Sequence, residues 1–198
     1  KKEIDFGSES ANHLFIEELS KSKLYLEYGS GASSFSAKKL NKNFYAIEGD
    51  IDFFRFIKKE LGSDNVKLKS LGIVSDYSIP LNIEFHDNKN PLNENLKKSI
   101  KAYCNSILEE FEEKNLSPDL VLVDGRYRVL TCLYLYKFFK KNKKKFKIII
   151  DDYIHRAYGE ILENFFHINK FERFGIATEI IENSTLEEKI EKSFYDYK

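Results

Sequence analysis

The sequence has no tryptophan, no methionine, only two cysteines and no long apolar run. Cys104 and Cys132 each stand among apolar residues, which indicates buried thiols in a reducing compartment. No stretch approaches the roughly 18 apolar residues of a membrane span, and residues 1–10 lack the apolar region of a signal peptide. We therefore expect a soluble, cytoplasmic protein. Methionine is absent even from position 1, so we do not take the first residue as the native start.

The sequence also lacks an excess of either charge. The 32 basic and 32 acidic residues give a formal net charge of zero, which removes the global electrostatic argument for a nucleic-acid partner or a strongly anionic surface. We expect neither nucleic acid nor membrane as a partner, and we interpret the lysine-rich residues 140–147 as a solvated turn. Aromatic residues are plentiful, with 17 Phe and 12 Tyr, and 198 residues suit a single packed domain.

Residues 23–50 carry the most informative local pattern. It predicts a strand at 24–27, a turn containing Gly29 and Gly31, a helix at 33–40, and a second strand at 44–47 that ends in Glu48. Such a crossover joins parallel strands and places the turn at the carboxyl edge of the sheet, where nucleotide-like ligands bind. The glycines leave room for a ligand against the main chain. Glu48 stands near the roughly 20-residue offset typical of an acid that binds a ribose.

The identity of the cofactor depends on position 34. A dinucleotide fingerprint requires a third glycine there, and this chain has Ser34, which argues against a nicotinamide-dependent oxidoreductase. LEYGSGASS followed by AIEGD instead resembles motifs I and II of class I S-adenosylmethionine-dependent methyltransferases. An ordinary tight turn of another α/β protein is the alternative for this stretch. The resemblance implies that the following residues bind S-adenosylmethionine: Glu27, Gly29, Ser30 and Gly31 toward its methionine end, and Glu48 on its ribose.

The rest of the chain alternates between helical and strand patterns. Helices are predicted at 9–20, 51–61, 93–114, 128–141, 153–166 and 185–198, strands at 66–71, 119–124 and 146–151, and a hairpin with a turn near Gly175. This alternation predicts an α/β fold with a Rossmann-like, doubly wound, mostly parallel sheet and helices on both faces. The resemblance implies the strand order 3-2-1-4-5-7-6, with the antiparallel hairpin at the C-terminal end. We expect one domain, with a lead-in helix in 1–22, a core at 23–182 and a tail at 183–198.

The segment at 72–91 has no clear period. Its IVSDYS stretch is similar to the element that reaches the adenine in these methyltransferases. The resemblance implies that Asp76 accepts a hydrogen bond from the exocyclic amine and that Tyr77 lies against the ring. A surface loop with a turn-forming aspartate is the alternative.

Three aspartates are predicted to meet at the carboxyl edge. Asp124 follows the fourth strand, and Asp151 and Asp152 follow the fifth. Unpaired like charges repel and raise one another's pKa, so we expect either a cation among them or compensation by arginines. Carboxylates without cysteine or neutral histidine ligands suit a hard divalent ion, with magnesium first and then manganese or calcium. A structural Asp-Asp helix cap is the third alternative.

This arrangement resembles the macrocin-type, metal-dependent sugar O-methyltransferases. The resemblance implies that the three aspartates hold Mg²⁺ or Mn²⁺, that the ion binds two acceptor hydroxyls, and that Asp124 or His155 removes the proton. The DGRYR element departs from the macrocin pattern. Arg126 and Arg128 would neutralise the aspartates without a metal, or bind an anionic group of the acceptor together with Arg156. His155 and Arg156 also fit the solvated face of a helix.

The sequence therefore predicts an S-adenosylmethionine-dependent O-methyltransferase. We expect it to act on a sugar or another small hydroxyl-bearing acceptor, free or on a glycan, with help from a divalent metal. The alternatives are a nicotinamide-dependent Rossmann oxidoreductase and a catalytically silent, methyltransferase-like binding module. A homodimer is left open.

Overall fold

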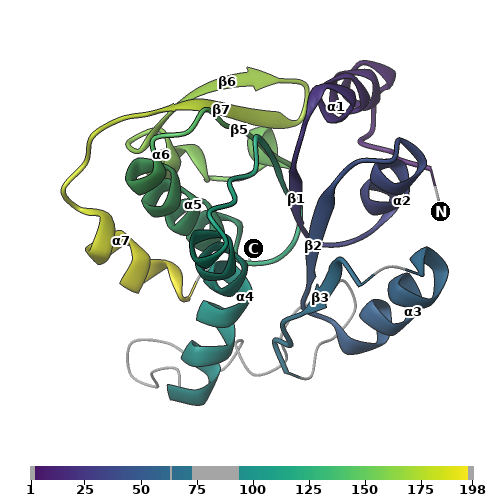
Figure 1. The fold of residues 1–198 in the computed structure, drawn as a ribbon. Coiled ribbons are helices and arrows are strands. Elements are labelled where there is room, and N and C mark those ends of the chain that lie inside the picture. The colour runs from purple at the N-terminus through teal and green to yellow at the C-terminus, as the bar shows by residue number, and fades with distance from the viewer. Residues whose placement is uncertain (1–2, 63, 73–93, 196–198) are drawn as a thin grey trace.

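The protein is described here from a computed structural model, which covers residues 3–62, 64–72 and 94–195 (Figure 1). Its strands are β1 (Tyr25–Tyr28), β2 (Phe44–Glu48), β3 (Val66–Leu68), β4 (Leu120–Val123), β5 (Lys147–Ile150), β6 (Phe166–Phe171) and β7 (Phe174–Ile180). Its helices are α1 (Glu9–Lys21), α2 (Ala32–Lys39), α3 (Ile51–Leu61), α4 (Glu94–Glu113), α5 (Arg128–Asn142), the 3-10 helix η2 (Tyr153–His155), α6 (Gly159–Leu162) and α7 (Leu186–Ser193).

The sheet has the predicted topology. Its order is β3-β2-β1-β4-β5-β7-β6, with β1 to β5 parallel and β7 antiparallel to both β5 and β6. A helix stands in the chain between each successive pair of parallel strands (α2, α3, α4 and α5 in turn), as parallel pairing requires. The α/β class, the strand order and the C-terminal antiparallel hairpin are thus confirmed.

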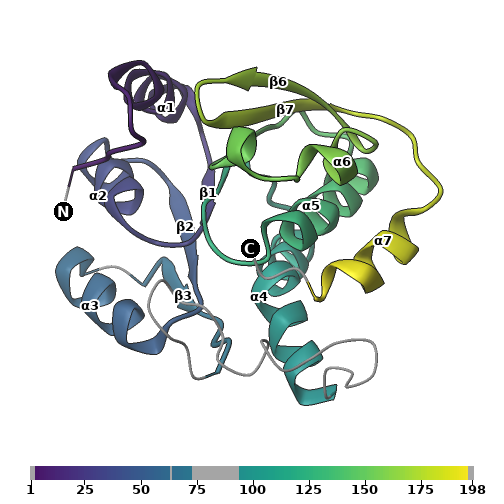
Figure 2. The same ribbon diagram turned by 180° about the vertical axis from the view of Figure 1, so that it is seen from behind.

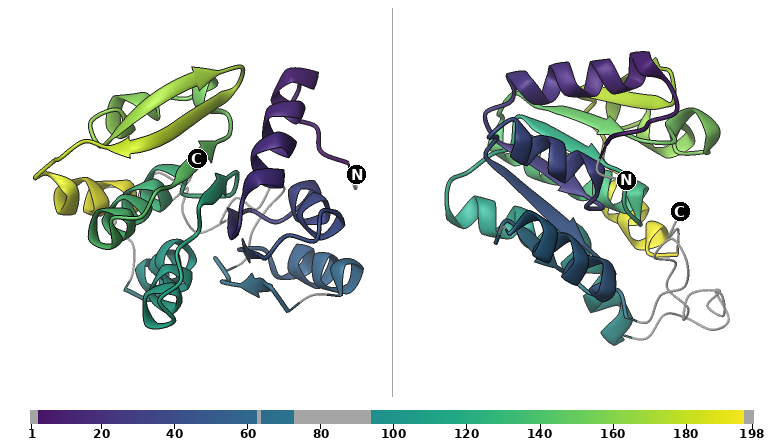
Figure 3. Two further views of the ribbon diagram at one scale, coloured as in Figure 1. Left: turned by 45° about the horizontal axis from the view of Figure 1, so that its top comes forward. Right: turned by 90° about the vertical axis from the view of Figure 1, so that its right-hand side faces the viewer.

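Each face of the sheet carries its own hydrophobic core. Along β4, Val121 and Val123 point to the core formed with α4, α5 and α7, while Leu120 and Leu122 point to the core formed with α1, α2 and α3. Figures 1 and 2 show these two groups of helices on opposite sides of the central strands, and Figure 3 shows the same layering from two further directions. Because helices cover both faces of the sheet, the sequences of β4 and β5 are continuous apolar runs.

The register of the central strands brings three turns to one level. Tyr28 pairs with both Ile47 and Val123, and Val123 pairs with Ile150. The residues that follow these positions therefore leave the sheet side by side at its carboxyl edge. This register places the glycine-containing turn, Glu48 and the strand-tip aspartates in one region, as the sequence predicted.

The predicted helix at 153–166 is wrong. The chain instead forms η2, an extended residue at Arg156 (φ −130°, ψ 155°) and the short α6 before β6 begins. Tertiary packing explains the break, because the Tyr153 ring lies against Gly175 of β7, where a Cβ atom would come within 2.5 Å of the ring. Gly159 also weakens a continuous helix. The hairpin turn lies at Glu172 and Arg173, just before the predicted Gly175.

None of the described helices is both long and apolar enough to cross a membrane.

Candidate functional site

The turn after β1 touches the turn after β4. Gly29 has φ +89°, and a Cβ atom added there would lie 2.8 Å from the Cα and N atoms of Gly125. Only glycine fits such a position without strain, because both the backbone angle and the close approach exclude a side chain. Gly31 differs, since its φ is 176° and a Cβ atom there would meet no atom of the described residues within 4 Å. Within the part of the chain that the structure describes, the main chain at Gly31 therefore borders open space, as a ligand-binding turn requires.

Glu27 is fully buried and braces the start of α2. Its Oε2 atom accepts a hydrogen bond from the Tyr25 hydroxyl at 2.7 Å, and its Oε1 atom accepts one from the Ser34 hydroxyl. Burial raises the pKa of Glu27 to about 7, and hydrogen bonds from Ser33, Ser34 and Tyr25 oppose the increase. Ser34 also accepts from the Gly31 N–H at 3.1 Å. Ser34 stands at the position where a dinucleotide site has glycine, and its hydroxyl holds the turn together by joining Gly31 to Glu27.

Glu48 lies at the tip of β2, and its carboxylate is surrounded by protein donors. Oε2 accepts from the N–H (3.2 Å) and the hydroxyl (2.7 Å) of Ser30, and Oε1 accepts from the N–H groups of Gly49 (2.8 Å) and Asp50 (2.9 Å). Only 4% of the residue is exposed. Burial raises its pKa, and these hydrogen bonds oppose the increase. Glu48 therefore ties the β1 turn to the β2 turn, and its contact with a ribose stays a prediction.

Asp76 and Tyr77, which were predicted to contact the adenine, lie outside the described residues.

Arg128 links the three strand-tip aspartates. Its Nη2 atom lies 3.1 Å from Oδ1 of Asp124, and its Nη1 atom lies 3.2 Å from Oδ2 of Asp152 and 2.7 Å from the main-chain oxygen of Asp151. The side chain is only 11% exposed. Arg128 is the first residue of α5, so the turn that presents Asp124 also presents its counter-charge.

Arg173 is the second cation of this cluster, and no sequence motif identified it. Its Nε atom lies 2.6 Å from Oδ1 of Asp151, and its Nη2 atom donates to Oδ2 of Asp151 at 2.8 Å and also contacts Asp152. The residue belongs to the β6–β7 turn. Because Gly175 pairs with Ile150, the antiparallel hairpin brings this turn to the carboxyl end of β5.

The aspartates do not form a metal site in this arrangement. No group of three or more His, Cys, Asp or Glu side chains in the described part of the chain could hold a metal ion. Each of the three carboxylates contacts a guanidinium instead. Desolvation and the neighbouring Asp151 raise the pKa of Asp124, and Arg128 opposes this increase. The contacts fit the predicted alternative of arginine pairing, with Arg173 rather than Arg126 as the second arginine.

Arg126 and Arg156 lie near this cluster. Arg126 is partly buried, and its N–H donates to the hydroxyl of Tyr103 at 3.3 Å. Burial lowers the pKa of Arg126, as does repulsion from Arg128 and Arg156. His155 and Arg156 are exposed at the end of η2, which fits the solvated alternative.

Tyr103 of α4 is a further residue that the sequence did not identify. Its hydroxyl occupies the space beside Gly125, where a Cβ atom would overlap it, and its ring lies 3.4 Å from where a Cβ of Gly49 would be. The residue is 2% exposed. The sequence signal for such a residue was the glycine directly after each strand-tip acid, Gly49 after Glu48 and Gly125 after Asp124. These glycines make room for the large side chain of Tyr103 between the two turns.

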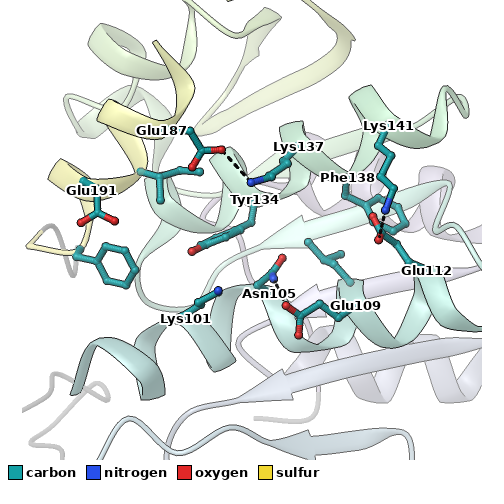
Figure 4. Close-up of a pocket in the computed structure, with 13 residues that line it drawn as sticks. Lys101, Asn105, Glu109, Glu112, Tyr134, Lys137, Phe138, Lys141, Glu187 and Glu191 are labelled. Atoms are coloured by element: carbon teal, nitrogen blue, oxygen red, sulfur yellow. Dashed lines mark hydrogen bonds and ion pairs between the residues drawn. The ribbon is translucent and has the colours of Figure 1, made fainter. Parts of the chain in front are cut away.

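A separate hollow of about 390 Å³ lies on the outer side of the helix layer, between α4, α5 and α7 (Figure 4). Tyr134 points into it, and ion pairs from Lys137 to Glu187 and from Lys141 to Glu112 cross its rim. It contains none of the predicted site residues.

The fold is similar to that of a solved methyltransferase-like protein from Silicibacter pomeroyi. The TM-score is 0.73 and the sequences are 19% identical over 99% of this chain and 100% of the other. No family model matches the sequence, and no curated protein matches it. At this identity the likeness establishes a methyltransferase-like fold.

Proposed function

We propose that this chain is an S-adenosylmethionine-dependent O-methyltransferase that acts on a sugar or another small hydroxyl-bearing acceptor. The observation that carries the proposal is the position of the Gly31 turn. It borders open space at the same sheet edge as a cluster of ionisable groups, within a methyltransferase-like fold. A donor site and an acceptor site would then be neighbours at the ends of β1 and β4.

The residues of the first turn fit the proposed cofactor. The open space that the described residues leave at Gly31 admits a ligand against the main chain, and α2 begins directly after it, as in helix N-termini that bind anionic groups. Glu27 and Ser34 would hold the turn in shape from behind, and Glu48 would fix its position relative to β2. S-adenosylmethionine, when bound, supplies a methyl group on a positively charged sulfur.

The second group of residues would handle the acceptor. Transfer forms a bond between the acceptor oxygen and the methyl carbon, breaks the sulfur–methyl bond, and releases the hydroxyl proton. We assign proton acceptance to Asp124, which follows the last residue of β4 at the carboxyl edge and whose pKa is raised by desolvation and by the neighbouring Asp151. We assign acceptor binding to Arg126 and Arg156, since Arg128 already contacts the aspartates. His155 is exposed and is the alternative base.

Assistance by magnesium or manganese, which the macrocin-type resemblance implied, is not part of this proposal. The carboxylates that would hold the ion contact Arg128 and Arg173. The proposed methyl transfer should therefore proceed at the same rate with and without a chelator.

Calorimetry with S-adenosylhomocysteine tests the donor site. We expect binding to the wild-type protein and a loss of at least about tenfold in affinity for Gly31→Leu, because the new side chain would fill the open space. Lys39→Leu adds the same side chain at the exposed far end of α2 and should leave the affinity unchanged. Equal affinities in all three proteins would refute the assignment of Gly31.

A catalytically silent binding module is the second candidate function. It is favoured by one observation, which is that the carboxylate of Glu48 already accepts hydrogen bonds from Ser30, Gly49 and Asp50. The same calorimetry separates the candidates, because a silent module would not bind S-adenosylhomocysteine. Binding of NAD instead would indicate the oxidoreductase alternative.

A further inference from the structure

Arg173 makes the closest charged contacts in the aspartate cluster, which we define as Asp124, Asp151, Asp152, Arg128 and Arg173. Its guanidinium contacts both carboxylate oxygens of Asp151, at 2.6 and 2.8 Å, and also contacts Asp152. The side chain of Asp151 is only 4% exposed, so its charge needs a partner. The Nη2 atom donates a hydrogen bond to Oδ2 and the Nε atom forms an ion pair with Oδ1, so the guanidinium brings positive charge to both oxygens of this buried carboxylate.

The hairpin turn that carries Arg173 is anchored on the first helix. The Ser10 hydroxyl of α1 donates to Oε1 of Glu172 at 2.6 Å. The rings of Phe6 and Phe174 pack edge to face, with centroids 5.0 Å apart. Figure 1 shows the β6–β7 turn beside the start of α1. The position of Arg173 is therefore fixed in two ways. Its neighbours Glu172 and Phe174 contact α1 and the segment just before it, and its own side chain contacts the aspartates.

The two guanidiniums together supply the charge of one divalent ion. Arg173 contacts Asp151 and Asp152, and Arg128 contacts Asp124 and Asp152, so all three carboxylates are bridged. A guanidinium keeps its charge at every physiological pH, but unlike a metal ion it has no ligand to exchange for an acceptor oxygen. It can fix the carboxylates in place without binding the substrate hydroxyl.

We propose that Arg173, acting with Arg128, is a built-in cation that takes the place of a divalent metal among Asp124, Asp151 and Asp152. Arg173 is thus a positioning residue that holds the aspartates at the carboxyl edge. Its use in methyl transfer rests on the function proposed above, whereas the exclusion of metal ions by Arg173 does not.

Titration with Mn²⁺, followed by the electron paramagnetic resonance signal of the free ion, tests this assignment. Removal of Arg173 leaves Asp151 and Asp152 without their closest counter-charge. We therefore expect Arg173→Ala to bind Mn²⁺ about tenfold more tightly than the wild-type protein. Arg173→Lys keeps a positive charge and should gain less. Arg55→Ala removes an arginine that pairs with an aspartate on exposed α3 and should behave as wild type.

Two further measurements make the result decisive. Asp151→Asn in the Arg173→Ala background should abolish the gain, since it removes the proposed ligand. If Arg173→Ala does not fold, as judged by circular dichroism, Arg173→Gln retains most of the side-chain volume and serves in its place. Equal Mn²⁺ affinity in wild type and in the folded charge-removing variant would overturn the proposal. Failure to bind S-adenosylhomocysteine would refute the proposed function and leave this titration unaffected.

Discussion

The two halves of the candidate site hold their carboxylates in different ways. In the glycine turn, defined as residues 27–34 with Glu48, neutral donors surround the acids: the hydroxyls of Tyr25, Ser30 and Ser34 and main-chain N–H groups. In the aspartate cluster the partners are guanidiniums. The pKa is raised in both halves, at Glu27 and Glu48 by burial and at Asp124 by desolvation and Asp151, but only in the aspartate cluster does a positive charge, that of Arg128, oppose the increase.

This difference separates two kinds of role. A turn held by neutral hydrogen bonds presents a shaped main chain and little fixed charge, which suits the uncharged and zwitterionic parts of a cofactor. A cluster of fixed charges orients groups around a reacting proton, which suits an acceptor. The four predictions below test this contrast, from the largest expected effect to the smallest.

Removal of Arg128 should have the largest effect on stability. Arg128→Ala removes the guanidinium that contacts Asp124 and leaves Asp151 and Asp152 with Arg173, at a site where the Arg128 side chain is only 11% exposed. Breaking a buried ion pair from one side costs about 3–5 kcal/mol, so we expect a loss of that order in the free energy of unfolding in urea. The control is Lys141→Ala, also on α5, whose 67%-exposed side chain pairs with Glu112. It should cost less than about 1 kcal/mol. Similar losses for both variants would mean that the cluster is no more than a set of surface ion pairs.

Alanine at Gly29 should have the next largest effect, and it tests the neutral half. The substitution places a Cβ atom 2.8 Å from the Gly125 main chain at a residue with φ +89°. Backbone strain and overpacking together should cost about 2–4 kcal/mol in urea unfolding. The Cβ atom of Gly31→Ala would meet no atom of the described chain within 4 Å, so this variant should change stability by less than about 0.5 kcal/mol. A large loss at Gly31 would show that the space beside it is filled.

The glycine turn was predictable because its parts are close in the sequence. The strand, the turn, the helix and Glu48 lie within residues 24–48, and periodicity with glycine placement locates all of them. The sheet order followed from the resemblance, and the placement of Asp124 and Asp151 followed from the ends of apolar strands. The sequence pattern did not predict where the Glu27 carboxylate points. It is turned inward, where it accepts hydrogen bonds from Tyr25 and Ser34.

The partners of the aspartates were less predictable because they depend on tertiary packing. Arg173 reaches Asp151 only through the antiparallel register of β7 on β5, and no local motif marks it. Tyr103 reaches Gly125 only through the packing of α4 against the sheet. The helix predicted at 153–166 failed for the same reason, since the packing of Tyr153 on Gly175 outweighs the local helical pattern.

The pH dependence of stability should report on Glu27. Its pKa rises in the folded state from an ordinary value of 4.5 to about 7. A group with a raised folded pKa contributes full stability below its unfolded pKa, and that contribution is lost as pH rises through 7. Relative to Glu27→Gln, the wild type should therefore lose about 2–3 kcal/mol between pH 5 and pH 8 in urea unfolding. A difference between the two proteins that stays constant over this range would show that Glu27 does not titrate there.

The smallest expected effect concerns the hydrogen bond from the Ser30 hydroxyl to Glu48 at 2.7 Å, which joins the β1 and β2 turns. Ser30→Ala removes a donor to a buried carboxylate, and a double-mutant cycle with Glu48→Gln should give a coupling energy of about 1 kcal/mol. This coupling energy should be the same in low salt and in about 0.5 M salt, because salt screens interactions between charges and Ser30 is neutral. The corresponding cycle of Arg173→Gln with Asp152→Asn should weaken with salt, since the side chain of Asp152 is 25% exposed. Equal salt dependence in both cycles would remove the contrast between the neutral glycine turn and the charged aspartate cluster.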